Sequence, residues 1–164
     1  MILGMSIHAF TIVHVIISLV GIVAGVVVAV TMARGGSSSG WTALTLLALV
    51  LTSVTGFFFP NPTFTPAQGV GIISLVVLAI AIIALYVLHL KGPWRWIYVV
   101  TAMIAIYLNC FVGVIQSFQK IDFLHALAPT QSSEPAFVVA QVILLAIFVV
   151  LGYGALKKFH PHAA

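Results

Sequence analysis

The chain has 164 residues, of which 63% are hydrophobic and only 5% carry a formal charge. Soluble domains have about one quarter of their residues charged, so this balance excludes a water-soluble fold of this size. The formal net charge of +4 comes from a few basic residues at the ends of apolar segments. Because these residues form no patch, the charge does not indicate a nucleic-acid partner.

The apolar residues form five blocks of about twenty residues, the length at which an α-helix crosses the hydrocarbon core of a bilayer. We therefore predict an all-α integral membrane protein, a single transmembrane domain over residues 1–164 built as a five-helix bundle. Its principal surroundings would be the lipid bilayer. The predicted spans are 9–32, 41–58, 67–89, 94–117 and 135–156.

The first span carries small and polar residues along one narrow arc at helical spacing. His14 and Ser18 stand on this arc, followed by Gly21 and Gly25, which form a G-x-x-x-G pattern. Such a pattern permits close approach of another helix, and it leaves open whether that helix belongs to the same chain or to a second copy.

Proline residues mark the connections on both sides of the third span. The second span ends in three successive phenylalanines, and the loop after it contains Pro60 and Pro62. We expect Thr65 to cap the third helix, with Pro66 in its first turn. Pro93 marks the start of the fourth span in the same way.

The fourth span has the clearest polar face, because Asn109, Gln116 and Lys120 recur at helical spacing with Gly113 between them. Amide groups facing lipid would remain unpaired in hydrocarbon, at a cost of about 1 kcal/mol or more each. This face should therefore turn toward other helices.

Two further polar residues, His14 on the first span and Gln141 on the fifth, fall at a similar depth. We therefore predict a polar cluster in the outer half of the bundle. Two interpretations stay open: structural hydrogen bonds, or an outward-opening pocket for a quinone, a lipid or a haem. The predicted ligand-binding residues are His14, Asn109, Gln116, Gln141, Lys120 and His125.

The longest connection, 118–135, contains the only two acidic residues, Asp122 and Glu134. We expect Ser132 or Ser133 to cap the fifth helix, with Glu134 in its first turn. His125 lies in the same connection, which is interpreted either as a lid over the pocket or as an ordinary solvated loop.

Five crossings place five of the six basic residues on one side of the membrane, and Lys120 on the other. By the positive-inside rule the first side is cytoplasmic, so the N-terminus is outside and the C-terminus is in the cytoplasm. The five residues are Arg34, Lys91, Arg95, Lys157 and Lys158.

No motif for metal binding or catalysis is present, so we expect no metal site and no catalytic residue. Cys110 is the only cysteine, which excludes a disulfide within one chain. His8 and His14 are six residues apart and do not form the i, i+4 pair of helical metal sites. The tail histidines His160 and His162 are expected to be solvated.

Three segments carry a resemblance to known sequences: residues 53–60 (SVTGFFFP), 94–98 (WRWIY) and 125–131 (HALAPTQ). In these blocks the chain resembles uncharacterised small polytopic inner-membrane proteins of Gram-negative bacteria. The resemblance implies a bacterial cytoplasmic-membrane location and no particular activity or cofactor.

Two functions follow as hypotheses. The first is a non-enzymatic subunit or accessory protein that packs against other membrane subunits or a second copy of itself. The alternative is a protein that binds a quinone, a lipid or a haem in electron transfer or sensing. An enzyme acting on a lipid-soluble substrate would need His14 or His125 as its general base.

Overall fold

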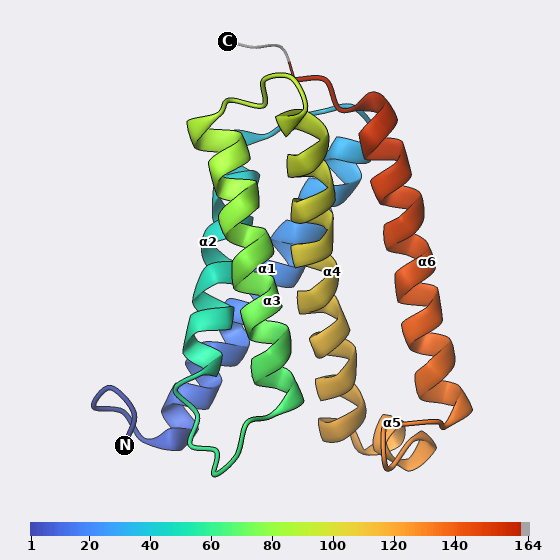
Figure 1. Cartoon of the computed structure of the whole chain (residues 1–164). Coiled ribbons are helices and arrows are strands. Elements are labelled where there is room, and N and C mark those ends of the chain that lie inside the picture. The colour runs from blue at the N-terminus through green and yellow to red at the C-terminus, as the bar shows by residue number, and fades with distance from the viewer. Residues whose placement is uncertain (162–164) are drawn as a thin grey trace.

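The computed structural model describes residues 1–161, and within that range the regular structure is helical. Five long helices stand side by side (Figure 1). They are α1 (Ile7–Ala33), α2 (Ser39–Gly56), α3 (Pro66–Ile82), α4 (Trp94–Lys120) and α6 (Pro135–Lys158). α3 continues into a π-helix, η1 (Ile83–Val87), and the short α5 (Asp122–Leu127) lies between α4 and α6.

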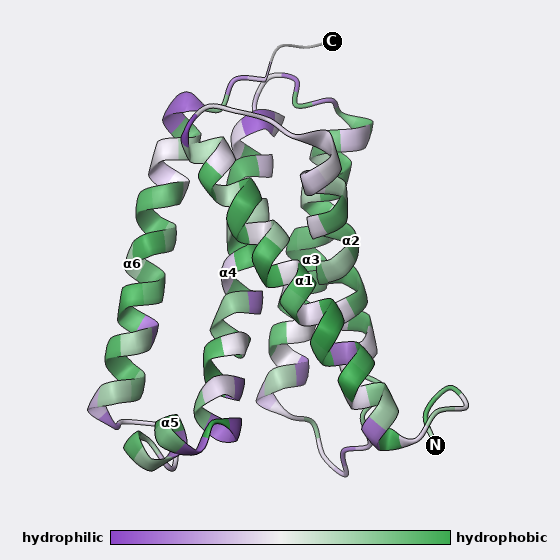
Figure 2. Cartoon of the chain, turned by 180° about the vertical axis from the view of Figure 1, so that it is seen from behind, coloured by the Kyte–Doolittle hydropathy of each residue, from purple (hydrophilic) through white to green (hydrophobic). Residues whose placement is uncertain are grey.

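The five candidate spans, with η1 counted as part of the third, are each long and apolar enough to cross a membrane. The prediction of an all-helical bundle with five helices able to span a membrane is therefore confirmed. Figure 2 shows the pattern directly: hydrophobic residues dominate the middle of the helices, and hydrophilic residues gather at the two ends of the bundle.

α1 and α4 hold the bundle together. α1 contacts α2, α4 and α6, while α4 contacts α1, α3 and α6, and α2 packs against α3. Each span contributes to one apolar core, which contains Val28, Leu49, Leu78, Ile106 and Phe148 among its buried residues. α6 stands at one edge of the bundle (Figure 1) and contacts only α1 and α4 among the long helices.

The G-x-x-x-G pattern of α1 is used inside the chain. A Cβ atom added at Gly25 would lie 2.7 Å from Cγ2 of Ile106 on α4, and one at Gly21 would lie 3.1 Å from Nδ2 of Asn109. A side chain at Gly25 would force Ile106 to shift, so the glycines allow this close approach of α1 to α4. The reciprocal glycine on α4 is Gly113, whose added Cβ would meet the Ile22 side chain at 2.9 Å.

The start of α3 confirms its predicted cap. The Thr65 hydroxyl accepts a hydrogen bond from the Gln68 amide, the Gln68 side chain accepts one from the Thr65 amide, and Pro66 is the first helical residue. Two-way capping of this kind satisfies amide groups that no helical carbonyl can reach.

The end of the third span differs from the predicted continuous helix up to residue 89. The chain leaves α-helical geometry at Ile83 and continues as a π-helix through Val87. His89 and Leu90 then adopt φ values of 49° and 57°, and the Leu90 amide donates to the Ala84 carbonyl at 2.9 Å. Hydropathy alone does not distinguish this wider turn from an α-helix, because both are equally apolar.

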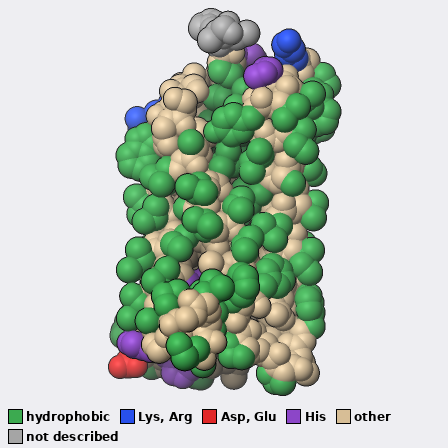
Figure 3. All heavy atoms as spheres, turned by 90° about the vertical axis from the view of Figure 1, so that its left-hand side faces the viewer, with side chains coloured by type: hydrophobic (Ala, Val, Ile, Leu, Met, Phe, Trp, Pro, Cys, Tyr) green, Lys and Arg blue, Asp and Glu red, His purple; other side chains and the backbone are tan. Residues whose placement is uncertain are grey.

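The two ends of the bundle carry different charges (Figure 3). We call one the basic end, because Arg34, Lys91, Arg95, Lys157 and Lys158 all lie there, in helix ends or in the connections beside them. The other is the acidic end, which holds Asp122 and Glu134 together with Lys120.

Arg95 fastens the C-terminal end of α6 at the basic end. Its Nη1 donates to the Leu156 carbonyl at 3.1 Å and to the Phe159 carbonyl at 2.9 Å. These are carbonyls that a helix end leaves without partners, so a cation here also complements the helix dipole. Phe159 is thereby held against Tyr98, with ring centroids 5.9 Å apart.

Candidate functional site

His14 packs against α2 in the acidic-end half of the bundle. Its Nδ1 lies 2.7 Å from the Thr55 hydroxyl oxygen, and its ring meets Phe59 edge-on at 5.2 Å between centroids. The Thr55 hydroxyl itself donates to the Leu51 carbonyl at 2.6 Å. Since that proton is committed to Leu51, the hydrogen-bond network assigns the histidine proton to Nδ1 and leaves Nε2 without it.

Asn109 sits at the crossing of α1 and α4. It is buried, its Nδ2 donates to the Ser18 carbonyl at 3.2 Å, and its Oδ1 accepts from the Ser18 hydroxyl at 3.4 Å. Both ends of the amide are therefore used by one residue of α1. The contact is possible because Gly21 leaves room beside the Asn109 side chain.

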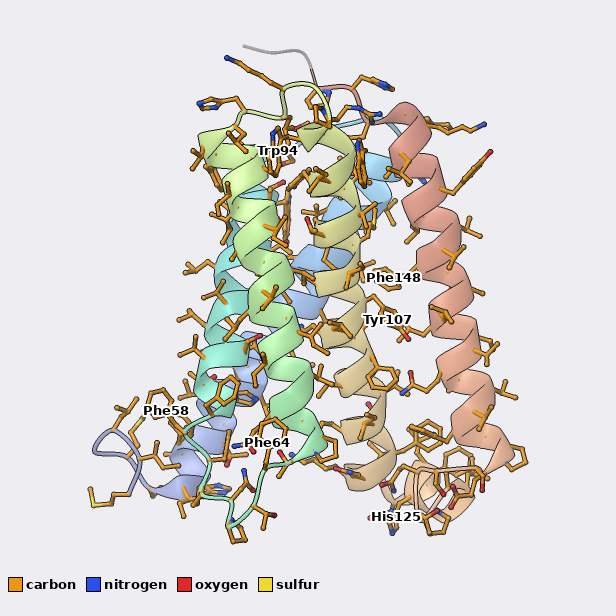
Figure 4. The ribbon with its side chains drawn as sticks, viewed as in Figure 1. Phe58, Phe64, Trp94, Tyr107, His125 and Phe148 are labelled. Atoms are coloured by element: carbon orange, nitrogen blue, oxygen red, sulfur yellow. The ribbon has the colours of Figure 1, made fainter. Side chains whose placement is uncertain are left out.

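Gln141 faces α4. Its Nε2 donates to the Phe111 carbonyl at 3.3 Å, while its Oε1 is buried and has no partner among the residues described. Aromatic side chains lie between α4 and α6, among them Tyr107 and Phe148 (Figure 4). Tyr107 meets Phe148 at 5.8 Å, and Phe118 meets Phe137 at 5.5 Å between centroids.

The remaining predicted site residues lie toward the acidic end. Gln116 is half-buried, and its side chain makes no hydrogen bond to other residues in the range 1–161. Lys120 is exposed at the end of α4. His125 is exposed on α5, a helix that the sequence analysis expected to be loop (Figure 4).

The predicted polar residues turn toward neighbouring helices, but they do so as separate pairs. His14 pairs with α2, Asn109 with α1 and Gln141 with α4, and within residues 1–161 no hydrogen bond joins these three to one another. The geometry here is that of structural contacts between helices, each using local partners.

A cavity of about 150 Å³ lies at the basic end, where the sequence analysis expected no site. It is bordered by the end of α1, the start of α2, η1, the start of α4 and the segment after α6. We call it the basic-end cavity. Its wall includes Val28, Thr42, Leu85, Tyr86, Tyr98 and Phe159.

Hydroxyl groups supply the polar part of the cavity wall, and none of its described side chains is charged. Ser37, Ser38 and Ser39 border it where α2 begins. The buried Tyr98 borders it from α4, and Thr42 borders it from α2. Hydroxyls both donate and accept hydrogen bonds, so this wall suits an uncharged polar group.

Neither the cavity nor the π-helix that borders it was predicted from the sequence. Leu85 and Tyr86 of η1 border the cavity, as does Leu90 with its positive φ. A π-turn widens a helix locally, and such turns are frequent at functional sites. The one available sequence signal was the run Lys91-Gly92-Pro93, which forces the chain to stop its helix nearby.

Glu134 organises the connection before α6, in a different way from the predicted one. It is the residue before the helix, not a member of its first turn, and neither Ser132 nor Ser133 caps α6. Its carboxylate instead accepts hydrogen bonds from the Thr130 amide at 2.9 Å, the Thr130 hydroxyl at 2.5 Å and the Ser132 amide at 2.9 Å. These bonds lower the pKa of Glu134 to about 2.

Metal ligands do not gather within residues 1–161, where no group of three His, Cys, Asp or Glu side chains is placed to hold an ion. Cys110 is free and buried in the core. His160 is exposed, and His162 lies outside the described residues.

Comparison of the chain with protein-family models, with curated proteins and with solved structures found no match in any of the three. The class that the fold and composition define is therefore an all-helical bundle with five candidate membrane spans.

A double-mutant cycle tests whether the polar contacts are independent. Ser18→Ala and Asn109→Ala should show a coupling energy of about 0.5 to 1.5 kcal/mol, because the Ser18 hydroxyl donates a hydrogen bond to the Asn109 side chain. His14→Ala and Asn109→Ala should be additive within about 0.5 kcal/mol, since they have no common partner. The free energy of unfolding in mixed detergent micelles provides the measurement. Strong coupling of the second pair would mean that one connected cluster exists.

Acidification should loosen the connection before α6. Because the pKa of Glu134 is lowered in the folded protein, its contribution is complete above the ordinary value near 4.5 and is lost as the pH falls from there toward 2. Hydrogen exchange of the Thr130 and Ser132 amides should accelerate across that window, after correction for intrinsic rates. Glu134→Gln should be loose at every pH, whereas the control Asp122→Asn should behave as the parent chain does.

Proposed function

We propose that this chain is a non-enzymatic membrane protein that binds a small molecule drawn from the lipid bilayer. The observation that supports the proposal is the basic-end cavity, about 150 Å³ in volume and lined by residues from separate parts of the chain. Concave sites with an apolar wall and a few convergent polar groups are the usual form of small-molecule sites.

The hydrogen bonds of the polar residues favour a ligand site in the basic-end cavity over one at the polar cluster predicted from the sequence. In the acidic-end half, His14 and Asn109 bond to Thr55 and Ser18, so these groups are engaged within the protein. At the basic end, by contrast, the serine hydroxyls that border the cavity make no hydrogen bond to other residues in the range 1–161. Among the described residues, no histidine borders this cavity, so its wall offers no histidine ligand for a haem.

We further propose that the basic end faces the cytoplasm of a bacterial cell and that the protein resides in the cytoplasmic membrane. The support is the gathering of Arg34, Lys91, Arg95, Lys157 and Lys158 at one end, as the positive-inside rule requires of a cytoplasmic side. The N-terminus would then be outside.

Cysteine labelling tests this topology. In a Cys110→Ala background, Ser37→Cys should react with a membrane-impermeant maleimide only after spheroplasts are lysed, because the α1–α2 connection would be cytoplasmic. Ser133→Cys in the connection before α6 should react in intact spheroplasts. The reverse pattern would overturn the proposed orientation.

A second candidate function is that of a subunit or accessory protein in a membrane complex or homo-oligomer. The observation that favours it is the position of α6, which stands at the edge of the bundle and buries only Phe137, Phe148 and Ala155 of its 24 residues. The G-x-x-x-G pattern gives it no support, because α4 already occupies that surface.

Native mass spectrometry of the protein released from membranes tests both functions. We expect a bound species of small-molecule mass, which Thr42→Phe should abolish by filling the cavity. The control Leu47→Phe adds the same ring to the exposed face of α2 and should retain the species. An added mass in the range of a protein would favour the subunit role, and a visible absorption spectrum would report a haem. An empty monomer would contradict the ligand-binding proposal.

A further inference from the structure

The size, charge and orientation of the basic-end cavity narrow the chemistry of its ligand. We propose that the ligand is an uncharged amphipathic molecule with a head group about the size of one six-membered ring, carrying hydroxyl or carbonyl oxygens, and an apolar tail. This inference rests on the proposed function, since it concerns the same cavity.

The volume limits what can enter. A cavity of about 150 Å³ is large enough for a molecule the size of benzene. A whole phospholipid or an acyl chain of membrane length does not fit in that space. The bound part must therefore be a compact head group, and any tail must lie outside the cavity.

The cavity borders both a polar segment and a lipid-facing residue. Ser37, Ser38 and Ser39 line it at the α1–α2 connection, at the end of the spans. Tyr86 lines it from η1, inside the third candidate span, and is 50% exposed on the surface of the bundle. The proposed ligand would place its head group in the cavity and its tail along Tyr86 in the lipid.

The charge of the wall argues against an ionised head group. A charge moved into this space would lose hydration without gaining a charged partner, because no described lining side chain is ionisable to a cation or carboxylate near neutral pH. Two nearby basic groups are engaged elsewhere. Arg95 holds the Leu156 and Phe159 carbonyls, and the Lys157 ammonium lies over the Tyr153 ring, 4.9 Å from its centroid.

Tyr98 is the residue best placed to recognise the head group. It is 2% exposed, its ring lies beside Phe159, and it borders the cavity together with Thr42. The two aromatic rings give an apolar wall, while the hydroxyls of Tyr98 and Thr42 supply a donor and an acceptor to an oxygen of the ligand. A ring bearing carbonyl or hydroxyl oxygens satisfies both requirements at once.

Binding to a panel of matched probes tests the inference. The protein is placed in phosphatidylcholine nanodiscs and titrated with a decyl-substituted benzoquinone, a decyl glycerol ether, decyl phosphate and decane, each followed by the fluorescence of Trp41, Trp94 and Trp96. All three indoles lie at the basic end. We expect saturable binding of the two uncharged, oxygen-bearing probes and none of decane.

Substitutions at the cavity wall test whether the probes bind through the hydroxyls of Tyr98 and Thr42. Tyr98→Phe and Thr42→Val should each weaken binding of the uncharged probes by about three- to tenfold, the value of one net hydrogen bond. Tyr153→Phe is the matched control, because this tyrosine is exposed on α6 near the same end. Circular dichroism and gel filtration establish that each variant is folded, and both wall substitutions preserve side-chain shape.

The outcomes separate the two proposals. Tighter binding of decyl phosphate than of the uncharged probes would overturn the inferred ligand class while leaving a ligand-binding function in place. Uncharged probes that bind with equal strength to the parent and to both wall variants would overturn the role assigned to Tyr98 and Thr42. Failure of every probe, together with an empty cavity in native mass spectrometry, would overturn the proposed function itself.

Discussion

Hydrocarbon provides no hydrogen-bond partners, and this constraint governs how the apolar bundle is assembled. The backbone meets it by forming helices. Polar side chains inside the spans meet it in two ways: hydroxyls such as that of Thr101 donate to a carbonyl of their own helix, and Asn109 and His14 find partners on neighbouring helices. Asn109 uses both its amide groups on Ser18, and His14 uses Thr55. Such contacts require close approach of the helices, which Gly21, Gly25 and Gly113 make possible at the crossing of α1 and α4.

The same constraint is relaxed at the basic end of the bundle, where polar groups are not limited to partners within the protein. Helices that cross a membrane end at the interface, where water, lipid head groups and side chains all compete for the last carbonyls and first amides. At the end of α6, Arg95 donates hydrogen bonds to two of these carbonyls, those of Leu156 and Phe159. Beside it the π-helix turns Leu85 and Tyr86 toward the start of α2, and the basic-end cavity lies between them.

The candidate site was the least predictable part of the molecule. Of the polar residues predicted to converge, His14, Asn109 and Gln141 do face neighbouring helices, whereas Lys120 and His125 are exposed. Spacing along one helix does not specify which neighbour each residue meets. His14 and Gln141 fall at similar depths and nevertheless pair with different helices. The cavity corresponds to no sequence motif, because its wall combines common residues such as Thr42 and Leu85 from distant segments.

Amino-acid order alone determined the five apolar spans, the helix class, the cap at Thr65 and the gathering of basic residues at one set of helix ends. These are local properties, since the length of an apolar run and the identity of a capping residue act within a few turns of chain. Only the tertiary structure decided that Gly25 meets Ile106 inside one chain, that the third span ends in a π-helix and that a cavity forms around Tyr98. Those features depend on which helices become neighbours, and that choice is made by side-chain packing among segments far apart in the sequence.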